Sequence, residues 1–171
     1  MAQALHPMTD QIKTLLNERG LWHEEFHHDA VTTSVEAAAT RPGYSLHQGA
    51  KALVMRCKPR GKPKQFILCV LPADMTLDNK QAKTALDAKD LRFATDEEVA
   101  TITADILPGA IPPFGNLFDL PVVMDLGFDD VDTICFNAGD RRFSIGMKLV
   151  DYLAIVTPLR AQIAKPPSPS C

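Results

Sequence analysis

Residues 109–121, GAIPPFGNLFDLP, constrain the fold of this chain more than any other stretch. The segment holds three prolines and two glycines. It can form neither a helix nor a central strand, because proline fixes its own φ angle and donates no backbone hydrogen bond. The segment is nevertheless strongly apolar. Its free peptide groups can face a small ligand as a preformed wall, or it can be a packed loop that closes one end of a sheet. The residues alone leave both interpretations open.

Length and charge set broad limits on the class of protein. The chain has 171 residues, of which 46% are hydrophobic, and this is enough for one domain with a proper core. The net charge is -3, with an excess of Lys and Arg in residues 1–70 and an excess of Asp and Glu in residues 71–171. Overall charge therefore indicates no nucleic-acid partner, which would need a local basic patch.

Cysteine spacing and hydropathy indicate the compartment. The four cysteines show no C-x-x-C spacing, so a zinc ribbon or a thioredoxin-type site is not expected. The N-terminus has no secretory apolar region, and the longest apolar run, FILCVL, is too short to cross a bilayer. We expect a reduced cytoplasmic protein without a membrane segment.

Hydrophobic periodicity predicts a mixture of helices and strands. Helices are expected over residues 8–20, 32–39, 76–86, 95–102 and 148–156. Strands are expected over residues 21–28, 50–56, 66–71, 91–94, 121–127, 133–139 and 141–147. Because the two kinds of element mix without a regular βαβ rhythm, we expect one α/β domain built on a mixed sheet. Residues 161–171, which end in a Pro/Ser-rich stretch, are expected to be a disordered tail.

Cap and turn residues sharpen these boundaries. We expect Thr9 or Asp10 to cap the start of the first helix and Gly20 to cap its end. Capping boxes are expected at Thr33 with Glu36 and at Thr95 with Glu98, and Thr76 or Asp78 is expected to cap the helix between them. A turn is expected at Gly139 and Asp140.

HEEFH, His23 to His27, matches the H-E-x-x-H pattern of zinc proteases. That chemistry needs both histidines on one helical face. Here Gly20 ends a helix, and the following residues alternate like a strand, on which positions four apart are separated by roughly 13 Å. Two imidazoles that far apart cannot share one zinc ion. A zinc hydrolase is therefore a distant alternative, and a half-exposed strand is the main interpretation.

Two further features carry charge. RCKPRGKPK holds five basic residues, Arg56, Lys58, Arg60, Lys62 and Lys64. This basic connector can contact a phosphate backbone or can be a solvated hairpin tip, and the residues do not separate the two. Lys51 opens a largely apolar strand, so its amine needs a path to water or an oxygen partner.

Three stretches, in order, resemble one known family. HQGAKALVMR, LRFATDEEVATITADILPGAIPPFGNLFDLPVVMD and DTICFNAGDRRFSIGMKLVDYLAIV are similar to the YbaK-like family, which comprises the prolyl-tRNA editing domain and its free-standing relatives. The resemblance covers roughly residues 9–158. Its marks are Lys51 at the start of a strand, the G-x-x-x-P loop from Gly109 to Pro113, and the NAG turn that begins at Asn137.

The resemblance implies both a fold and an activity. The fold is a single α/β domain, here residues 1–160, with a mixed, mostly antiparallel, barrel-like sheet surrounded by helices. The activity is that of a trans-editing aminoacyl-tRNA deacylase, which hydrolyses the ester of a mischarged tRNA, here tRNA-Pro or a related tRNA that carries a small amino acid, without a metal or another cofactor. A non-catalytic module of the same fold, which binds tRNA or a nucleotide beside a synthetase, is the alternative.

The resemblance also implies site residues and partners. Lys51 corresponds to the family's essential lysine. The substrate pocket is expected to comprise Gly109, Ile111, Pro113, Phe114, Gly115, Asn137 and Gly139. The partner is the acceptor end of a mischarged tRNA, with prolyl-tRNA synthetase as a candidate second partner and a monomer or weak homodimer as the expected state.

The residues fit this chemistry, because the sequence shows no Ser-His-Asp constellation. An aminoacyl ester is already activated, so an enzyme need only position water and stabilise the oxyanion.

One departure concerns the alanine-clearing branch of the family, which has a histidine where Asn137 stands here. An amide does not titrate near neutrality, so the resemblance leaves open which amino acid is removed.

Overall fold

The structure is a computed structural model, and it describes residues 3–169. Within this range, the helices are α1 Pro7–Glu18, α2 Ser34–Ala39, α3 Asn79–Ala85, α4 Asp96–Thr103 and α5 Leu149–Val156. The strands are β1 His23–His27, β2 Ala50–Pro59, β3 Gln65–Pro72, β4 Thr76–Leu77, β5 Ala88–Phe93, β6 Val122–Asp125, β7 Thr133–Asp140, β8 Phe143–Lys148, β9 Leu159–Ala161 and β10 Ala164–Lys165. Every strand and helix expected from the sequence is present, with shifted ends.

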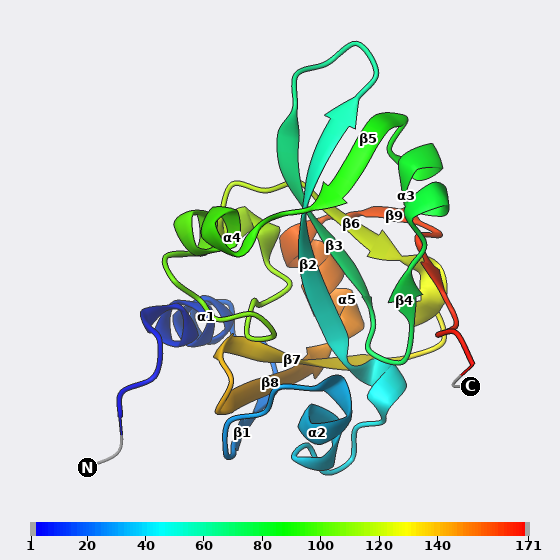
Figure 1. The fold of residues 1–171 in the computed structure, drawn as a ribbon. Helices are drawn as coiled ribbons and strands as arrows, with labels where there is room; N and C mark the ends of the chain where they lie inside the picture. Colours follow the sequence, from blue (N-terminus) through cyan, green and yellow to red (C-terminus); the bar gives the residue numbers. More distant parts are fainter. Residues whose placement is uncertain (1–2, 170–171) are drawn as a thin grey trace.

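The strands form three sheets (Figure 1). The largest has the order β5-β2-β3-β6-β9, with antiparallel pairing up to β3 and parallel pairing beyond it. A second, antiparallel sheet has the order β1-β8-β7, and β4 pairs with β10. The expected mixed α/β domain is confirmed, although no sheet among residues 3–169 closes into a barrel.

The pairing of β2 leaves part of one edge open. β2 pairs with β3 over residues 50–57 but with β5 only from Met55 onward. The ladder to β5 ends where the Ala94 N–H donates to the Val54 carbonyl at 3.0 Å. Among the described residues, no strand lies beside residues 51–53 on that edge. An open edge presents unpaired N–H and C=O groups, and the candidate site lies there.

Two apolar clusters fill the faces of the large sheet. The larger lies between β2, β3, the β7–β8 hairpin, α1 and α5, and its fully buried side chains include Phe114, Phe136 and Tyr152. The smaller lies under α3 and includes Cys69 and Ile163. The apolar strands 50–56 and 66–71 of the sequence are apolar on both faces because each face meets one of these clusters.

The helix caps follow the expected chemistry with one correction. The capping boxes at Thr33 and at Thr95 are both present, and Asp78 caps α3. The start of α1 is different, because His6 accepts from the Met8 N–H and Pro7 takes the first helical position. Proline suits that position because its missing N–H has no partner there anyway.

The late hairpin and the tail also depart from expectation. The turn between β7 and β8 lies at residues 141–142, because a bulge between Asn137 and Asp140 shifts the register beyond Gly139. Residues up to Lys165 are ordered, since β10 pairs with β4 and Ile163 is fully buried. Residues 161–165 of the expected tail therefore pack against the domain, and residues 170–171 lie outside the described range.

Candidate functional site

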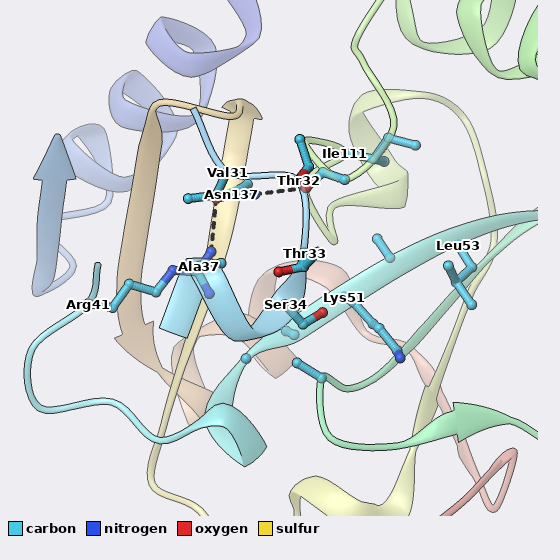
Figure 2. A pocket seen from close by; sticks show the side chains of 15 residues that line it. Val31, Thr32, Thr33, Ser34, Ala37, Arg41, Lys51, Leu53, Ile111 and Asn137 are labelled. Atoms are coloured by element: carbon cyan, nitrogen blue, oxygen red, sulfur yellow. Dashed lines mark hydrogen bonds between the residues drawn. The ribbon is translucent and has the colours of Figure 1, made fainter. Parts of the chain in front are cut away.

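A pocket of about 170 Å³ lies where α2, the open edge of β2 and the start of the 109–121 loop meet (Figure 2). Its lining includes Arg41, Lys51, Ala52, Gly109, Ile111 and Asn137. Sites for drug-sized ligands run to roughly 300–1,000 Å³, so this pocket suits a small group such as one amino acid. Four of the residues expected in the site, Lys51, Gly109, Ile111 and Asn137, are thus brought together.

The 109–121 loop combines both interpretations of its sequence. Its first residues, Gly109 and Ile111, line the pocket. Further along, Phe114 is fully buried, with its ring edge-on to Tyr152 at a centroid distance of 5.5 Å. The Tyr152 hydroxyl donates to the Pro113 carbonyl at 2.5 Å. Pro113 and Phe114 therefore anchor the loop in the core rather than facing a ligand.

Gly115 and Gly139 also serve packing. A Cβ atom at Gly115 would lie 2.4 Å from the Leu120 carbonyl oxygen, and one at Gly139 would lie 2.9 Å from the Met8 Cβ. Gly139 has a φ angle of 92°, which glycine adopts without strain. Its N–H donates to the Ala110 carbonyl at 2.9 Å. These glycines position the loop wall, but they do not line the pocket.

Asn137 uses both ends of its amide within the protein. Its Nδ2 donates to the Gly109 carbonyl at 2.8 Å, and its Oδ1 accepts from Arg41 Nη2 at 2.9 Å and from the Ser144 hydroxyl at 3.0 Å. The side chain is only 9% exposed. Asn137 therefore fastens the loop to β7, which the sequence could not indicate.

Arg41 is a buried cation that no pattern in the sequence indicated. Its side chain is 6% exposed, and burial lowers the pKa of its guanidinium. Nε donates to Ser144 and Nη2 to Asn137, both neutral acceptors. The third nitrogen, Nη1, has no hydrogen-bond partner within residues 3–169. It lies 3.8 Å from the position that a Cβ atom on Gly49, a pocket residue, would occupy. A buried charge without a counter-ion is costly, so this arrangement favours an oxygen-bearing ligand.

Lys51 lines the pocket with its alkyl chain, while its ammonium turns away from Asn137 (Figure 2). Nζ donates to the Met75 carbonyl in the turn between β3 and β4. Burial lowers the pKa of Lys51, and the charge of Asp74 offsets part of this effect. The amine retains donors for a further partner because an ammonium has three. Lys51 and Ile111 pack on opposite faces of β2, so the pocket wraps around the strand's open edge.

His47 supports the turn that holds Lys51. Its Nδ1 lies 2.9 Å from Asp74, and its Nε2 lies 2.7 Å from the Gly127 carbonyl and 3.2 Å from Asp130. Burial lowers the pKa of His47, but these acceptors outweigh it, so the pKa is raised. Because both ring nitrogens face acceptors, the protonated form fits this site.

HEEFH forms the expected strand β1 rather than a zinc helix. His23 lies 3.6 Å from Glu25, and the ring of His27 packs edge-on against Phe143. Within residues 3–169, no three His, Cys, Asp or Glu side chains are grouped to hold a metal ion. The zinc alternative therefore lacks a ligand set.

The basic connector is the far end of the β2–β3 hairpin, which projects from the body of the domain (Figure 1). Arg60, Lys62 and Lys64 are exposed, whereas Arg56 and Lys58 are half-buried within β2. At about 3.3 Å per strand residue, Arg60 lies roughly 30 Å from Lys51 along β2. Thus the connector and the pocket are separate surfaces.

The fold and the pocket together define a class. A mixed α/β domain with a small pocket lined by a lysine and a proline-rich backbone wall is what the sequence resemblance predicts for an aminoacyl-tRNA editing domain. A family model described as the aminoacyl-tRNA editing domain matches residues 28–155, and the chain belongs to that family. The family, the fold class and an editing activity on aminoacyl-tRNA, all expected from the sequence, are thereby confirmed.

Individual relatives agree with this assignment. The chain is 37% identical over 145 residues to the multifunctional Ser/Thr-tRNA deacylase ProXp-y of Escherichia coli K12, covering 84% of this chain and 85% of the relative. The protein of the same name from strain O157:H7 matches equally.

Solved structures share the fold. The crystal structure of a candidate trans-editing enzyme for prolyl-tRNA synthetase has a TM-score of 0.77 at 24% identity, covering 95% of this chain and 99% of that one. A hypothetical protein gives the same TM-score at 18% identity, with 91% of this chain and 99% of that one covered.

None of the helices in residues 3–169 has the length and apolar character needed to cross a membrane.

Proposed function

We propose that this chain is a trans-editing deacylase that removes a small hydroxylated amino acid, serine or threonine, from mischarged tRNA. The observation that carries the proposal is the pocket itself, where Lys51 and the Gly109–Ile111 wall meet around one open strand edge. Its volume of about 170 Å³ suits a single small amino acid. Editing is the activity of the family to which the chain belongs.

The choice of serine or threonine rests on two observations. The relative with 37% identity is named as a Ser/Thr-tRNA deacylase. The pocket lining also includes polar groups, among them Thr33 and Ser34 at the start of α2 and Nη1 of Arg41. A pocket that hydrogen-bonds a hydroxyl rejects an analogue that lacks it more strongly than an apolar pocket rejects one extra methylene.

Lys51 supplies the electrostatic part of catalysis in this proposal. Its ammonium is held at the pocket by one neutral carbonyl, that of Met75. It retains donors for a phosphate of the tRNA end or for the charge that develops on the ester. Since the ester is activated, a positioned water is a sufficient nucleophile.

The basic connector is proposed to bind the tRNA body. Arg60, Lys62 and Lys64 are exposed at the tip of the hairpin, roughly 30 Å along β2 from the pocket. Lysine and arginine side chains supply the sequence-independent part of affinity for a phosphate backbone. We further propose that the protein acts in the cytoplasm as a monomer or weak homodimer, with prolyl-tRNA synthetase as a candidate partner.

A panel of alanyl-, cysteinyl-, seryl- and threonyl-tRNA tests the proposal. The wild type should release serine and threonine fastest. Lys51→Ala should lower the rate by about 10²–10³, the loss expected for one preorganised donor. Lys148→Ala, which removes an exposed lysine on β8, is the matched control and should leave the rate unchanged.

Two results would oppose the proposal. If the wild type deacylates none of the four substrates, the non-catalytic binding module becomes the better description. If Lys51→Ala retains full activity, Lys51 has no part in the mechanism.

A further inference from the structure

The open edge of β2 presents one residue's peptide groups to the pocket. In an antiparallel ladder, alternate residues direct both N–H and C=O toward the same neighbouring strand. Val54 directs its carbonyl to Ala94, on the β5 side, and Gly49 accepts from Ala73, on the β3 side. Even-numbered residues of β2 therefore face the β5 side, and Ala52 directs both its groups there. Among residues 3–169 nothing pairs with Ala52 on that edge, and it lines the pocket.

We propose that the edited amino acid binds this edge as a strand of one residue. The proposal rests on the deacylase function proposed above. The substrate's α-ammonium donates to the Ala52 carbonyl, and its ester carbonyl accepts from the Ala52 N–H. This is the two-bond ring of an antiparallel strand pair, and an exposed strand edge is a common place for an extended ligand to add.

This pairing also fixes where the amino-acid side chain lies. Residues directly opposite in an antiparallel pair place their side chains on the same face of the sheet. The Ala52 methyl lies on the face of the larger apolar cluster, together with Ala50 and Ile111, whereas Leu53 packs on the other face. The substrate side chain would therefore enter the part of the pocket lined by Ile111. The small side chains of Ala50 and Ala52 leave room for it.

Arg41 is an independent sign that the end of the pocket beside Gly49 receives oxygen. Arg41 as a whole residue is 6% exposed, and its Nη1 makes no hydrogen bond within residues 3–169. Asn137 and Ser144 hold the other two nitrogens, so the group is fixed in place. An oxygen of the bound substrate that reaches this end of the pocket would satisfy this donor.

The Ala52 N–H would then act in the reaction. Water adds to the carbonyl carbon, and the C=O electron pair moves onto the oxygen that this N–H contacts. When the carbonyl re-forms, the bond from carbon to the ribose oxygen breaks, and that oxygen takes the proton that the water loses. The products are the free amino acid and deacylated tRNA. A preorganised backbone donor aimed at such an oxyanion lowers the barrier.

A backbone ester at position 52 tests this assignment. Incorporating lactic acid in place of Ala52 removes the N–H and adds no atoms. Single-turnover deacylation of seryl-tRNA should slow by about 10²–10³, the loss for one oxyanion donor, with the melting temperature unchanged. The matched control places the α-hydroxy acid analogue of methionine at Met55, which does not line the pocket and whose N–H faces its β3 partner Ile67. It should lower the melting temperature and leave the rate of the folded fraction unchanged.

Each outcome is decisive. An unchanged rate in the lactic acid variant, with an active wild type, overturns the Ala52 role and leaves the deacylase function standing. A loss of stability equal to that at Met55 also overturns it, because the N–H would then be engaged within the protein. An inactive wild type contradicts the proposed function instead. Ala52→Pro, which an edge strand tolerates, gives a recombinant check with the same expected loss.

Discussion

Replacing Asn137 distinguishes a structural clamp from a substrate-binding group. In the folded protein, its amide joins the Gly109 carbonyl to Arg41 and Ser144 through three hydrogen bonds of 2.8–3.0 Å. Asn137→Ala removes all three at once. The Ser144 hydroxyl retains partners in Arg41 and His28. The Gly109 carbonyl and Arg41 Nη2 lose the partners that Asn137 supplies.

The expected cost follows mainly from Arg41, which is buried, because Gly109 is exposed and its carbonyl can bond to water. Leaving a buried polar group unpaired costs about 1–3 kcal/mol, and more for a charged one. We therefore expect Asn137→Ala to lower the free energy of unfolding by about 3 kcal/mol. For a chain of this size, each kcal/mol corresponds to about 2–4 °C, so the melting temperature should fall by about 6–12 °C.

Urea denaturation and thermal melting measure this effect directly. Asn116→Ala is the matched control, since Asn116 is exposed in the same domain and its loss should stay within about 0.5 kcal/mol. If Asn137→Ala abolishes deacylation but melts with the wild type, Asn137 is a substrate-binding group, as the sequence resemblance implied. The clamp would then be refuted.

Two further predictions concern charge. Neutralising Lys58, Arg60 and Lys62 together should weaken tRNA binding. It should also flatten the plot of log affinity against log salt concentration by about 0.7–0.9 in slope for each lost phosphate contact. An unchanged slope in a binding titration would exclude the hairpin tip from the tRNA-binding surface. The raised pKa of His47, due to Asp74, the Gly127 carbonyl and Asp130, should stabilise the fold fully below about pH 6.5. That contribution should be lost as the pH rises through the raised value, so the urea midpoints of wild type and His47→Gln should converge at high pH; a constant gap would contradict this.

Local chemistry was readable from the sequence because it depends on neighbours in the chain. The capping boxes at Thr33 and Thr95 and the helix-ending Gly20 each rest on residues a few positions apart. The apolar strands and the proline-rich segment were equally clear. Together with Lys51 they sufficed to name the family and its fold.

Only the tertiary structure decided which of these residues make the site. Arg41 and Asn137 are 96 positions apart, and no pattern links them before the chain folds. Phe114, expected in the pocket, belongs to the core because Tyr152 packs against it. The Ala52 edge is open only because β5 begins its pairing at Met55. Hydrophobic periodicity and cap chemistry depend on residues a few positions apart. A pocket depends instead on which backbone and side-chain groups, far apart along the chain, find partners and which are left without one.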